Sequence, residues 1–203
     1  MNKRILIACE FSGTVRDAFS RAGWDAWSCD IIPTESLQTL EEGKHIQADV
    51  LTIINEDWDV VIAHPPCTFL TRRAQYWNKI YNRESELENA INFFTAIAEA
   101  PCKHLAIENP IGIMSKLYKK PSQIIQPYEF GDPESKATCL WLKNLPNLTP
   151  TKRVEPIYHI SATGRKYAFN DKIWDKKLRQ KLRSKTFSGI ADAMAEQWTE
   201  YLM

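Results

Sequence analysis

Long apolar runs are absent from this 203-residue sequence, and their absence bears on where the protein works. No stretch approaches the roughly 18 consecutive apolar residues that a membrane-spanning helix requires. The opening residues, MNKRILIACEFSG, turn polar too soon for the apolar core of a secretory signal peptide. We therefore expect a cytoplasmic protein that has no membrane partner.

Paired cysteines are lacking as well. The five cysteines are odd in number, lie far apart and form no C-x-x-C pair: Cys9, Cys29, Cys67, Cys102 and Cys139. This pattern argues against a disulfide framework or a zinc ribbon, and it suits a reducing compartment. The histidines show no metal-ligand spacing to one another or to a cysteine, so the sequence predicts no metal site.

Repeats, low-complexity tracts and long linkers are also missing, so residues 1–203 are expected to form a single domain. The first two thirds of the chain alternates short apolar runs with longer helical or polar segments. Such alternation predicts βαβ units and a parallel sheet wrapped on both faces. The expected fold is therefore α/β, with a doubly wound, mostly parallel sheet.

The apolar pattern also predicts where the elements lie. Central strands are expected at residues 4–10, 24–30, 58–64 and 103–109. Helices are expected at 14–23, 48–54, 84–100, 171–183 and 188–203. Residues 126–148 predict a loop followed by one or two strands, and residues 149–170 predict a loop.

Net charge is only +1, but it is unevenly distributed. Between Lys152 and Lys185 there are eleven Lys and Arg residues against three acids, a balance of +8, which leaves about −7 elsewhere. A basic segment on an otherwise acidic protein suggests a polyanionic partner such as nucleic acid. A solvated amphipathic helix would explain the same residues equally well.

The residues of chemical interest follow the expected strands. The first strand runs into CEFSG, the second ends at Asp30, the third runs into HPPC and the fourth into ENP. In open parallel sheets, ligands bind beyond the carboxyl ends of the strands. We therefore expect these four strand ends to converge on one edge and to form a site.

Two of these strand ends carry candidate catalytic groups. Cys67 follows Pro65 and Pro66, whose fixed φ angles would aim its side chain. A lone cysteine is usually an inert thiol, but Cys67 together with Glu108 at the next strand end would form a nucleophile and carboxylate pair. For His64, a packing role at the strand end is favoured.

Residues near the first two strands suggest a nucleotide-like ligand. Gly13 would let the backbone approach the ligand, and the helix that follows would add amide donors. Asp30, about twenty residues downstream, stands where an acid binds a ribose hydroxyl. Asp49 could accept a hydrogen bond from an adenine amino group, although a helix cap explains it equally well.

In this order, over residues 4–142, the motifs resemble the DNA cytosine carbon-5 methyltransferase family in its compact phage and prophage type. The resemblance implies a Rossmann-like fold, S-adenosylmethionine as cofactor, and DNA as partner in the cytoplasm of a bacterial host cell. It implies methyl transfer to carbon 5 of cytosine through a covalent Cys67 adduct at carbon 6. Glu108 would bind the cytosine N3 and amino group, and Lys136 would replace an arginine as a further catalytic residue.

The resemblance also implies binding residues. Those for the cofactor are Phe11, Ser12, Gly13, Asp30, Ile31, Asp49 and Pro65. Those for the nucleic acid are Thr68, Arg72, Arg73, Lys136, Arg165 and Lys166. The segment after Cys67 would be the mobile loop that closes over a base flipped out of the stack.

A full target-recognition domain has no room in this chain, because only a short basic segment at about 149–187 stands in its place. Three alternatives follow: short or relaxed recognition, a homodimer, or a substrate other than duplex DNA. The enzyme could modify a free or single-stranded pyrimidine nucleotide, or transfer a group other than methyl. A catalytically idle DNA-binding protein with this fold is the alternative outside enzymes.

Overall fold

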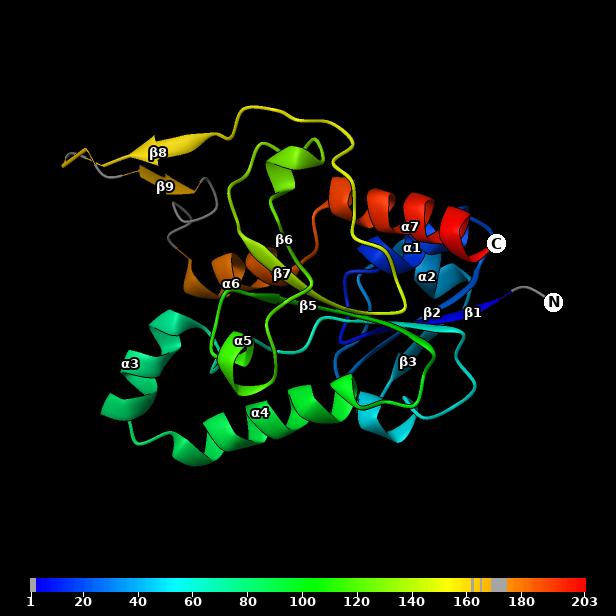
Figure 1. Ribbon diagram of the computed structural model, residues 1–203, viewed down its shortest axis with the longest axis horizontal. Coiled ribbons are helices and arrows are strands. Elements are labelled where there is room, and N and C mark those ends of the chain that lie inside the picture. The colour runs from blue at the N-terminus through cyan, green and yellow to red at the C-terminus, as the bar shows by residue number, and fades with distance from the viewer. Residues whose placement is uncertain (1–2, 162, 165, 169–174) are drawn as a thin grey trace.

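The structure, a computed structural model, describes residues 3–161, 163–164, 166–168 and 175–203 (Figure 1). In these ranges seven strands form one sheet in the order β3-β2-β1-β4-β5-β7-β6. Their bounds are β1 Arg4–Ala8, β2 Asp25–Asp30, β3 His45–Gln47, β4 Val60–Ala63, β5 His104–Pro110, β6 Gln123–Ile125 and β7 Thr138–Lys143. Strands β8 (Tyr158–Ile160) and β9 (Lys166–Ala168) form a separate antiparallel pair.

The central strands are paired in parallel, so their carboxyl ends lie at the same edge of the sheet. β1 pairs with β2 and with β4, and β4 pairs with β5, all in parallel. The register places Ala8 opposite Ala63, and Ala63 opposite Ile107. β7 is antiparallel to both β5 and β6. The predicted mostly parallel, doubly wound α/β sheet is confirmed.

Helices cover both faces of this sheet. Figure 1 shows α1 and α7 on one side of the sheet and α4 on the other. The α-helices are α1 Thr14–Arg21, α2 Leu37–Glu41, α3 Arg72–Ile80, α4 Glu84–Ala98, α5 Met114–Leu117, α6 Lys176–Ser184 and α7 Ser188–Leu202. Two 3₁₀ turns are η1 (Val50–Thr52) and η2 (Pro127–Glu129). None of the helices in the described ranges combines the length and the apolar character that crossing a bilayer requires.

Alternation along the strands divides the core between the two faces. On the α1 and α7 side, Ile7 and Ile62 of the sheet pack in one buried cluster with Phe19 and Trp198. On the α4 side, the neighbouring residue Val61 belongs to a second cluster that contains Phe94. Successive strand side chains point to opposite faces, so a run such as VVIA supplies both clusters at once.

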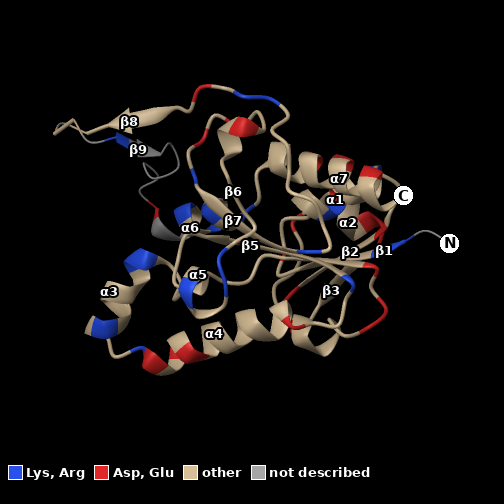
Figure 2. Cartoon of the chain, viewed as in Figure 1, with Lys and Arg blue, Asp and Glu red and all other residues tan. Residues whose placement is uncertain are grey.

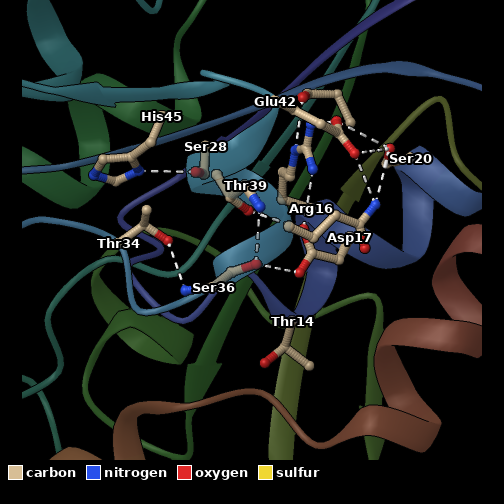
Figure 3. Close-up of polar contacts among 12 residues, drawn as sticks. Thr14, Arg16, Asp17, Ser20, Ser28, Thr34, Ser36, Thr39, Glu42 and His45 are labelled. Carbon is tan, nitrogen blue, oxygen red and sulfur yellow. Dashed lines mark hydrogen bonds and ion pairs between the residues drawn. The ribbon is translucent and has the colours of Figure 1, made fainter.

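A polar network ties α1 to α2 beside the sheet (Figure 3). The buried guanidinium of Arg16 pairs with Asp17 and Glu42, and its Nε donates to the Ala26 carbonyl of β2 at 2.9 Å. Asp17 in turn accepts hydrogen bonds from the Ser36 and Thr39 hydroxyls. These bonds fix the loop after β2 against the start of α1.

Several expected boundaries differ from the structure. The prediction of a loop over residues 149–170 is wrong, because the β8–β9 hairpin lies in that range. The segment after Cys67 is not an open loop: Thr71 caps α3, and its hydroxyl accepts from the Ala74 N–H at 3.2 Å. Of the helix expected at 171–183, residues 171–174 lie outside the described residues, and α6 begins at Lys176.

The N-terminus of α7 rests on a close backbone contact, which generates a prediction. A Cβ at Gly189 would stand 1.8 Å from the Phe130 carbonyl oxygen, and the Gly189 N–H donates to Asp132 at 2.9 Å. Gly189→Ala should therefore lower the free energy of unfolding by about 1–3 kcal/mol, measured by urea denaturation. The N-cap position of α7 is Phe187 and the neighbouring Ser188 is exposed, so Ser188→Ala should change the free energy of unfolding by less than about 0.5 kcal/mol. If both variants lost the same free energy of unfolding, the close contact at Gly189 would not be the cause.

Candidate functional site

Four adjacent strands deliver the candidate residues to one edge. Cys9 follows β1 with φ 58°, a strained conformation for a residue other than glycine. Asp30 ends β2, His64 follows β4 and Glu108 lies near the end of β5. The His64 N–H donates to the Ala8 carbonyl at 2.9 Å, which continues the β1–β4 pairing past the last strand residue. The expected convergence of strand ends is what the sheet order produces.

The double proline is held against the next strand. Pro65 is buried, and its carbonyl accepts a hydrogen bond of 2.7 Å from the Asn109 side chain. The Cys67 carbonyl accepts from the Leu70 N–H at 3.0 Å, so a turn follows at once. The ENP motif therefore positions the loop that carries Cys67, in addition to supplying Glu108.

Glu108 lies beside His64 and close to the positive charge of Lys136. Its Oε2 is 3.3 Å from His64 Nδ1. Burial alone would raise the pKa of the Glu108 carboxyl, but the hydrogen bond from His64 and the charge of Lys136 outweigh burial and leave that pKa below its ordinary value. At neutral pH, Glu108 is therefore a carboxylate that can accept a hydrogen bond from a ligand.

Cys67 carries the opposite shift. Burial raises the pKa of the Cys67 thiol, and the negative charge of Glu108 raises it further. Lys136 and Arg183 lower this pKa but do not overcome burial. At neutral pH the Cys67 side chain is therefore a thiol, and the charges of Lys136 and Arg183 favour its ionisation.

The basic helix α6 reaches this edge of the sheet. The Lys136 ammonium donates to the Arg183 carbonyl at 2.9 Å, and Lys181 and Lys185 both pair with Glu35 in the loop after β2. Lys185 also lies 5.8 Å from the centre of the Phe11 ring. The C-terminal half of the basic segment thus borders the site, and α6 is marked by Lys and Arg in Figure 2.

The loop after β1 is closely packed. Gly13 has φ 72°, and a Cβ there would stand 2.3 Å from the Ser36 Cβ, so only glycine fits. Because Gly13 has no side chain to cap α1, Glu10 does so: its carboxylate accepts from the Val15 N–H at 2.7 Å and the Arg16 N–H at 3.1 Å. Ser12 also donates to this carboxylate, at 3.2 Å.

Beyond β2 the surface is both acidic and apolar. Burial raises the pKa of the Asp30 carboxyl. The Ile32 N–H donates to this carboxylate at 3.2 Å and lowers the pKa, but by less than burial raises it. Ile31 beside it is 72% exposed. Asp49 caps η1 by accepting from the Leu51 N–H at 3.0 Å. Within the described ranges, no three His, Cys, Asp or Glu side chains gather in a way that could hold a metal ion.

The expected nucleic-acid residues fall into three places. Thr68 is exposed next to Cys67, and Arg72 and Arg73 are exposed at the start of α3. Lys166 is exposed on β9, in the hairpin that projects from the main sheet, so the structure does not bring it to the strand ends (Figure 1). Arg165 lies outside the described residues.

Three residues that the sequence did not assign to the site belong to it by position. A packing role was expected for His64, but its ring also contacts Glu108. Glu10 caps α1, directly after the loop that would bind the cofactor. Both could have been found by treating every polar residue at a strand end as a candidate. No sequence signal distinguishes Arg183 from the other cations of α6.

Comparison with known proteins supports the fold. No protein-family model matches the chain, and no curated protein matches it. Among solved structures, it is similar to the Entamoeba histolytica methyltransferase EhMeth, with 15% identity and a TM-score of 0.52 over 76% of this chain and 58% of that one. An E. coli protein named as a prophage-encoded DNA modification methyltransferase matches with 17% identity and a TM-score of 0.47, over 76% of this chain and 52% of that one.

At such identities the likeness concerns the fold alone. The chain has the Rossmann-like α/β fold that EhMeth also has. It spans between half and three fifths of the length of the two solved structures it matches.

The charges around Cys67 generate a prediction for its reactivity. Glu108→Gln removes a negative charge, so the pKa of Cys67 should fall and the thiol should alkylate faster at a given pH. Lys136→Met should raise that pKa and slow the reaction. The measurement is the iodoacetamide rate at Cys67 from pH 6 to 10, followed by peptide mass spectrometry. Glu196→Gln, on an exposed position of α7, serves as the charge-matched control and should leave the profile unchanged.

Proposed function

We propose that the protein is an S-adenosylmethionine-dependent methyltransferase that methylates carbon 5 of cytosine in DNA. The observation that carries the proposal is the placement of Cys67 and Glu108 at neighbouring strand ends, with the charge of Lys136 acting on both. EhMeth, a protein named as a methyltransferase, has the same fold and supports the reaction class. A protein that only bound DNA would need neither the thiol nor the carboxylate.

The residues beyond β1 and β2 fit the proposed cofactor. A partly buried carboxylate at Asp30 stands next to the exposed apolar surface of Ile31, and adenosine offers ribose hydroxyls and an apolar ring to such a pair. Phe11, Ser12 and Gly13 would contact the methionine part, while Asp49 and Pro65 would contribute at the edges. When bound, S-adenosylmethionine supplies the methyl group.

The chain's own residues would activate the base. The Cys67 S–H bond breaks, the sulfur forms a bond to carbon 6, and the C5=C6 π bond breaks and leaves an electron pair for carbon 5. The proton from the thiol passes through the Glu108 carboxylate to N3, so the ring does not build up negative charge. Lys136 would stabilise the charge near the base carbonyl or a phosphate, as a point charge. After the transfer, the carbon-5 proton leaves to water, the bond between the Cys67 sulfur and carbon 6 breaks, and the N3 proton returns through Glu108 to the sulfur.

A covalent adduct is the most direct test. A 5-fluorocytosine oligonucleotide cannot lose a proton from carbon 5, so with S-adenosylmethionine present it should remain bound to Cys67 and be mapped there by mass spectrometry. Cys67→Ser should form no adduct. Glu108→Gln should form it about 10²–10⁴-fold more slowly, although its thiol is the more reactive towards iodoacetamide. Absence of an adduct with duplex, single-stranded and mononucleotide substrates would overturn the proposed function.

The surface of α3 favours an unpaired strand as the second candidate substrate. Tyr76, Trp77 and Tyr81 are 65%, 41% and 57% exposed, and the Trp77 and Tyr81 rings stack with centroids 5.7 Å apart. Arg72 and Arg73 are exposed on the same helix, which is marked by basic residues in Figure 2. Aromatic rings beside cations bind single strands by stacking on bases and pairing with phosphates.

Binding to this helix can be tested without any methyl transfer. Oligodeoxythymidylate, which contains no cytosine, should quench Trp77 fluorescence, and Trp77→Ala should weaken binding by about 1–3 kcal/mol. Tyr201→Ala, an exposed tyrosine on α7, should bind as the unchanged protein does. Tighter binding to duplex of the same length, without quenching, would favour duplex DNA instead.

A further inference from the structure

The helix α3 reverses the usual amphipathic pattern of a surface helix. Its buried residues are Ala74 and Asn78, which are four positions apart and so share one face. Large apolar side chains form its exposed outer face: Tyr76, Trp77 and Ile80. Among the residues that the structure describes, none from α3 belongs to either buried core cluster, and Figure 1 shows this helix away from the sheet. Apolar burial therefore does not explain what holds α3 in place.

Polar bonds attach α3 to the segment that carries Cys67. The Gln75 Nε2 donates to the Phe69 carbonyl at 2.8 Å, and the Asn78 Nδ2 donates to the same oxygen at 2.9 Å. A carbonyl oxygen has two lone pairs, so the two amides together saturate it. Next to Phe69, the Leu70 N–H donates back to the Cys67 carbonyl at 3.0 Å. The turn that follows Cys67 is therefore bonded directly to α3.

The same segment is also bonded to the end of β5 and to the chain that follows it. The Asn109 side chain donates to the Pro65 carbonyl at 2.7 Å, and the Ile113 N–H donates to the Leu70 carbonyl at 2.9 Å. The Leu70 side chain is 1% exposed and packs in the cluster on the α4 side of the sheet. Hydrogen bonds on both sides of Cys67 thus fix the backbone that carries it.

Asn78 brings a polar group to a buried position, since it is only 4% exposed. An amide that lost its acceptor there would be a buried polar group without a partner, which is costly. A hydrogen bond also has a preferred distance and direction, whereas an apolar contact can form in many orientations. The bond from Asn78 to the Phe69 carbonyl therefore specifies where α3 stands relative to the Cys67 segment.

We propose that Gln75 and Asn78 are positioning residues, which hold the outer face of α3 in a fixed place relative to the Cys67 sulfur. The inference rests on the proposed function and deepens its single-stranded candidate substrate. A strand stacked on Trp77 would present a neighbouring cytosine to a nucleophile whose place is set before the strand arrives, which avoids the cost of ordering it afterwards. The two amides touch neither the base nor the sulfur, because they act through the Phe69 carbonyl.

This arrangement differs from the mobile loop that was expected after Cys67. The segment need not close over the base, since its carbonyl groups are already bonded to α3 and to the chain after β5. The moving part is instead the nucleic acid, and an unpaired strand bends towards the sulfur more easily than a duplex does. The positioning role therefore favours a base that is already out of the stack.

The first experiment needs neither DNA nor methyl transfer. Hydrogen exchange measured by NMR reports how often the Leu70 N–H leaves the Cys67 carbonyl. Loss of one ordinary hydrogen bond should speed this exchange by about 2–10-fold in Gln75→Met or Asn78→Leu. Because the two amides share one acceptor, the double variant should exceed the product of the two single effects. Asn92→Leu, exposed on α4, should exchange as the unchanged protein does.

Met and Leu form helices at least as readily as the amides that they replace, so α3 should stay helical in these variants. An exchange rate at Leu70 that is the same in the double variant and in Asn92→Leu would overturn the proposal.

The second experiment separates positioning from binding. The rate of adduct formation is measured against the concentration of an oligodeoxythymidylate that contains one 5-fluorocytosine, with S-adenosylmethionine present. The Gln75→Met, Asn78→Leu double variant should have a maximal rate about 10–100-fold lower at an unchanged half-saturating concentration, because its outer face is intact. Trp77→Ala should raise the half-saturating concentration by about 5–150-fold, as expected for the loss of one stacked base.

The outcomes of the two experiments are distinguishable. A double variant that binds oligodeoxythymidylate as weakly as Trp77→Ala would show that the two amides only keep α3 folded, and this result would overturn the positioning role. If the unchanged protein forms no adduct with any substrate, the proposed function fails, while exchange at Leu70 still decides whether the amides fix the Cys67 segment.

Discussion

The site depends on one constraint: the parallel strands β2, β1, β4 and β5 are paired in a register that ends them side by side. Backbone pairing brings Ala8, Ala63 and Ile107 side by side, and the residues that follow them are Cys9, His64 and Glu108. A slip of one residue would turn these side chains to the other face of the sheet and would exchange the strand residues that pack in the two buried clusters. The same hydrophobic burial that fixes the register therefore fixes the positions of the chemical groups.

Electrostatics then determines how these groups behave. Glu10 is buried and the Glu108 side chain is 13% exposed, but the pKa values of the two carboxyl groups shift in opposite directions. Burial dominates at Glu10, whereas at Glu108 the hydrogen bond from His64 and the charge of Lys136 together outweigh burial. The antiparallel strand β7 makes this difference possible, since it runs beside β5 and starts two residues after Lys136. The basic helix α6 adds Arg183 near Cys67 and is tied to the loop after β2 through Glu35.

The segments that sequence reasoning missed share a weak apolar signal. Strands β3 and β6 are three residues long, too short for any periodicity to show. In α3 only Ala74 and Asn78 are buried, so its sequence lacks the apolar periodicity that would have predicted a helix. Among the side chains that the structure describes, none from the β8–β9 hairpin belongs to either core cluster. In contrast, β1 and β4 are almost wholly buried, and their continuous apolar runs made them predictable.

The sequence by itself determined the sheet class, the strand ends and the types of residue that stand there, because apolar runs and prolines act locally. These features alone predict that Cys67 and Glu108 form a pair of nucleophile and carboxylate. Only the tertiary structure decided that His64 contacts Glu108, that Glu10 caps α1 beside it, and that Lys136 and Arg183 act on the thiol. Apart from the Glu10 cap, those contacts join residues 44 or more positions apart, as with His64 and Glu108, and their strength depends on burial. Neither separation in space nor exclusion of water can be read from the order of residues along the chain.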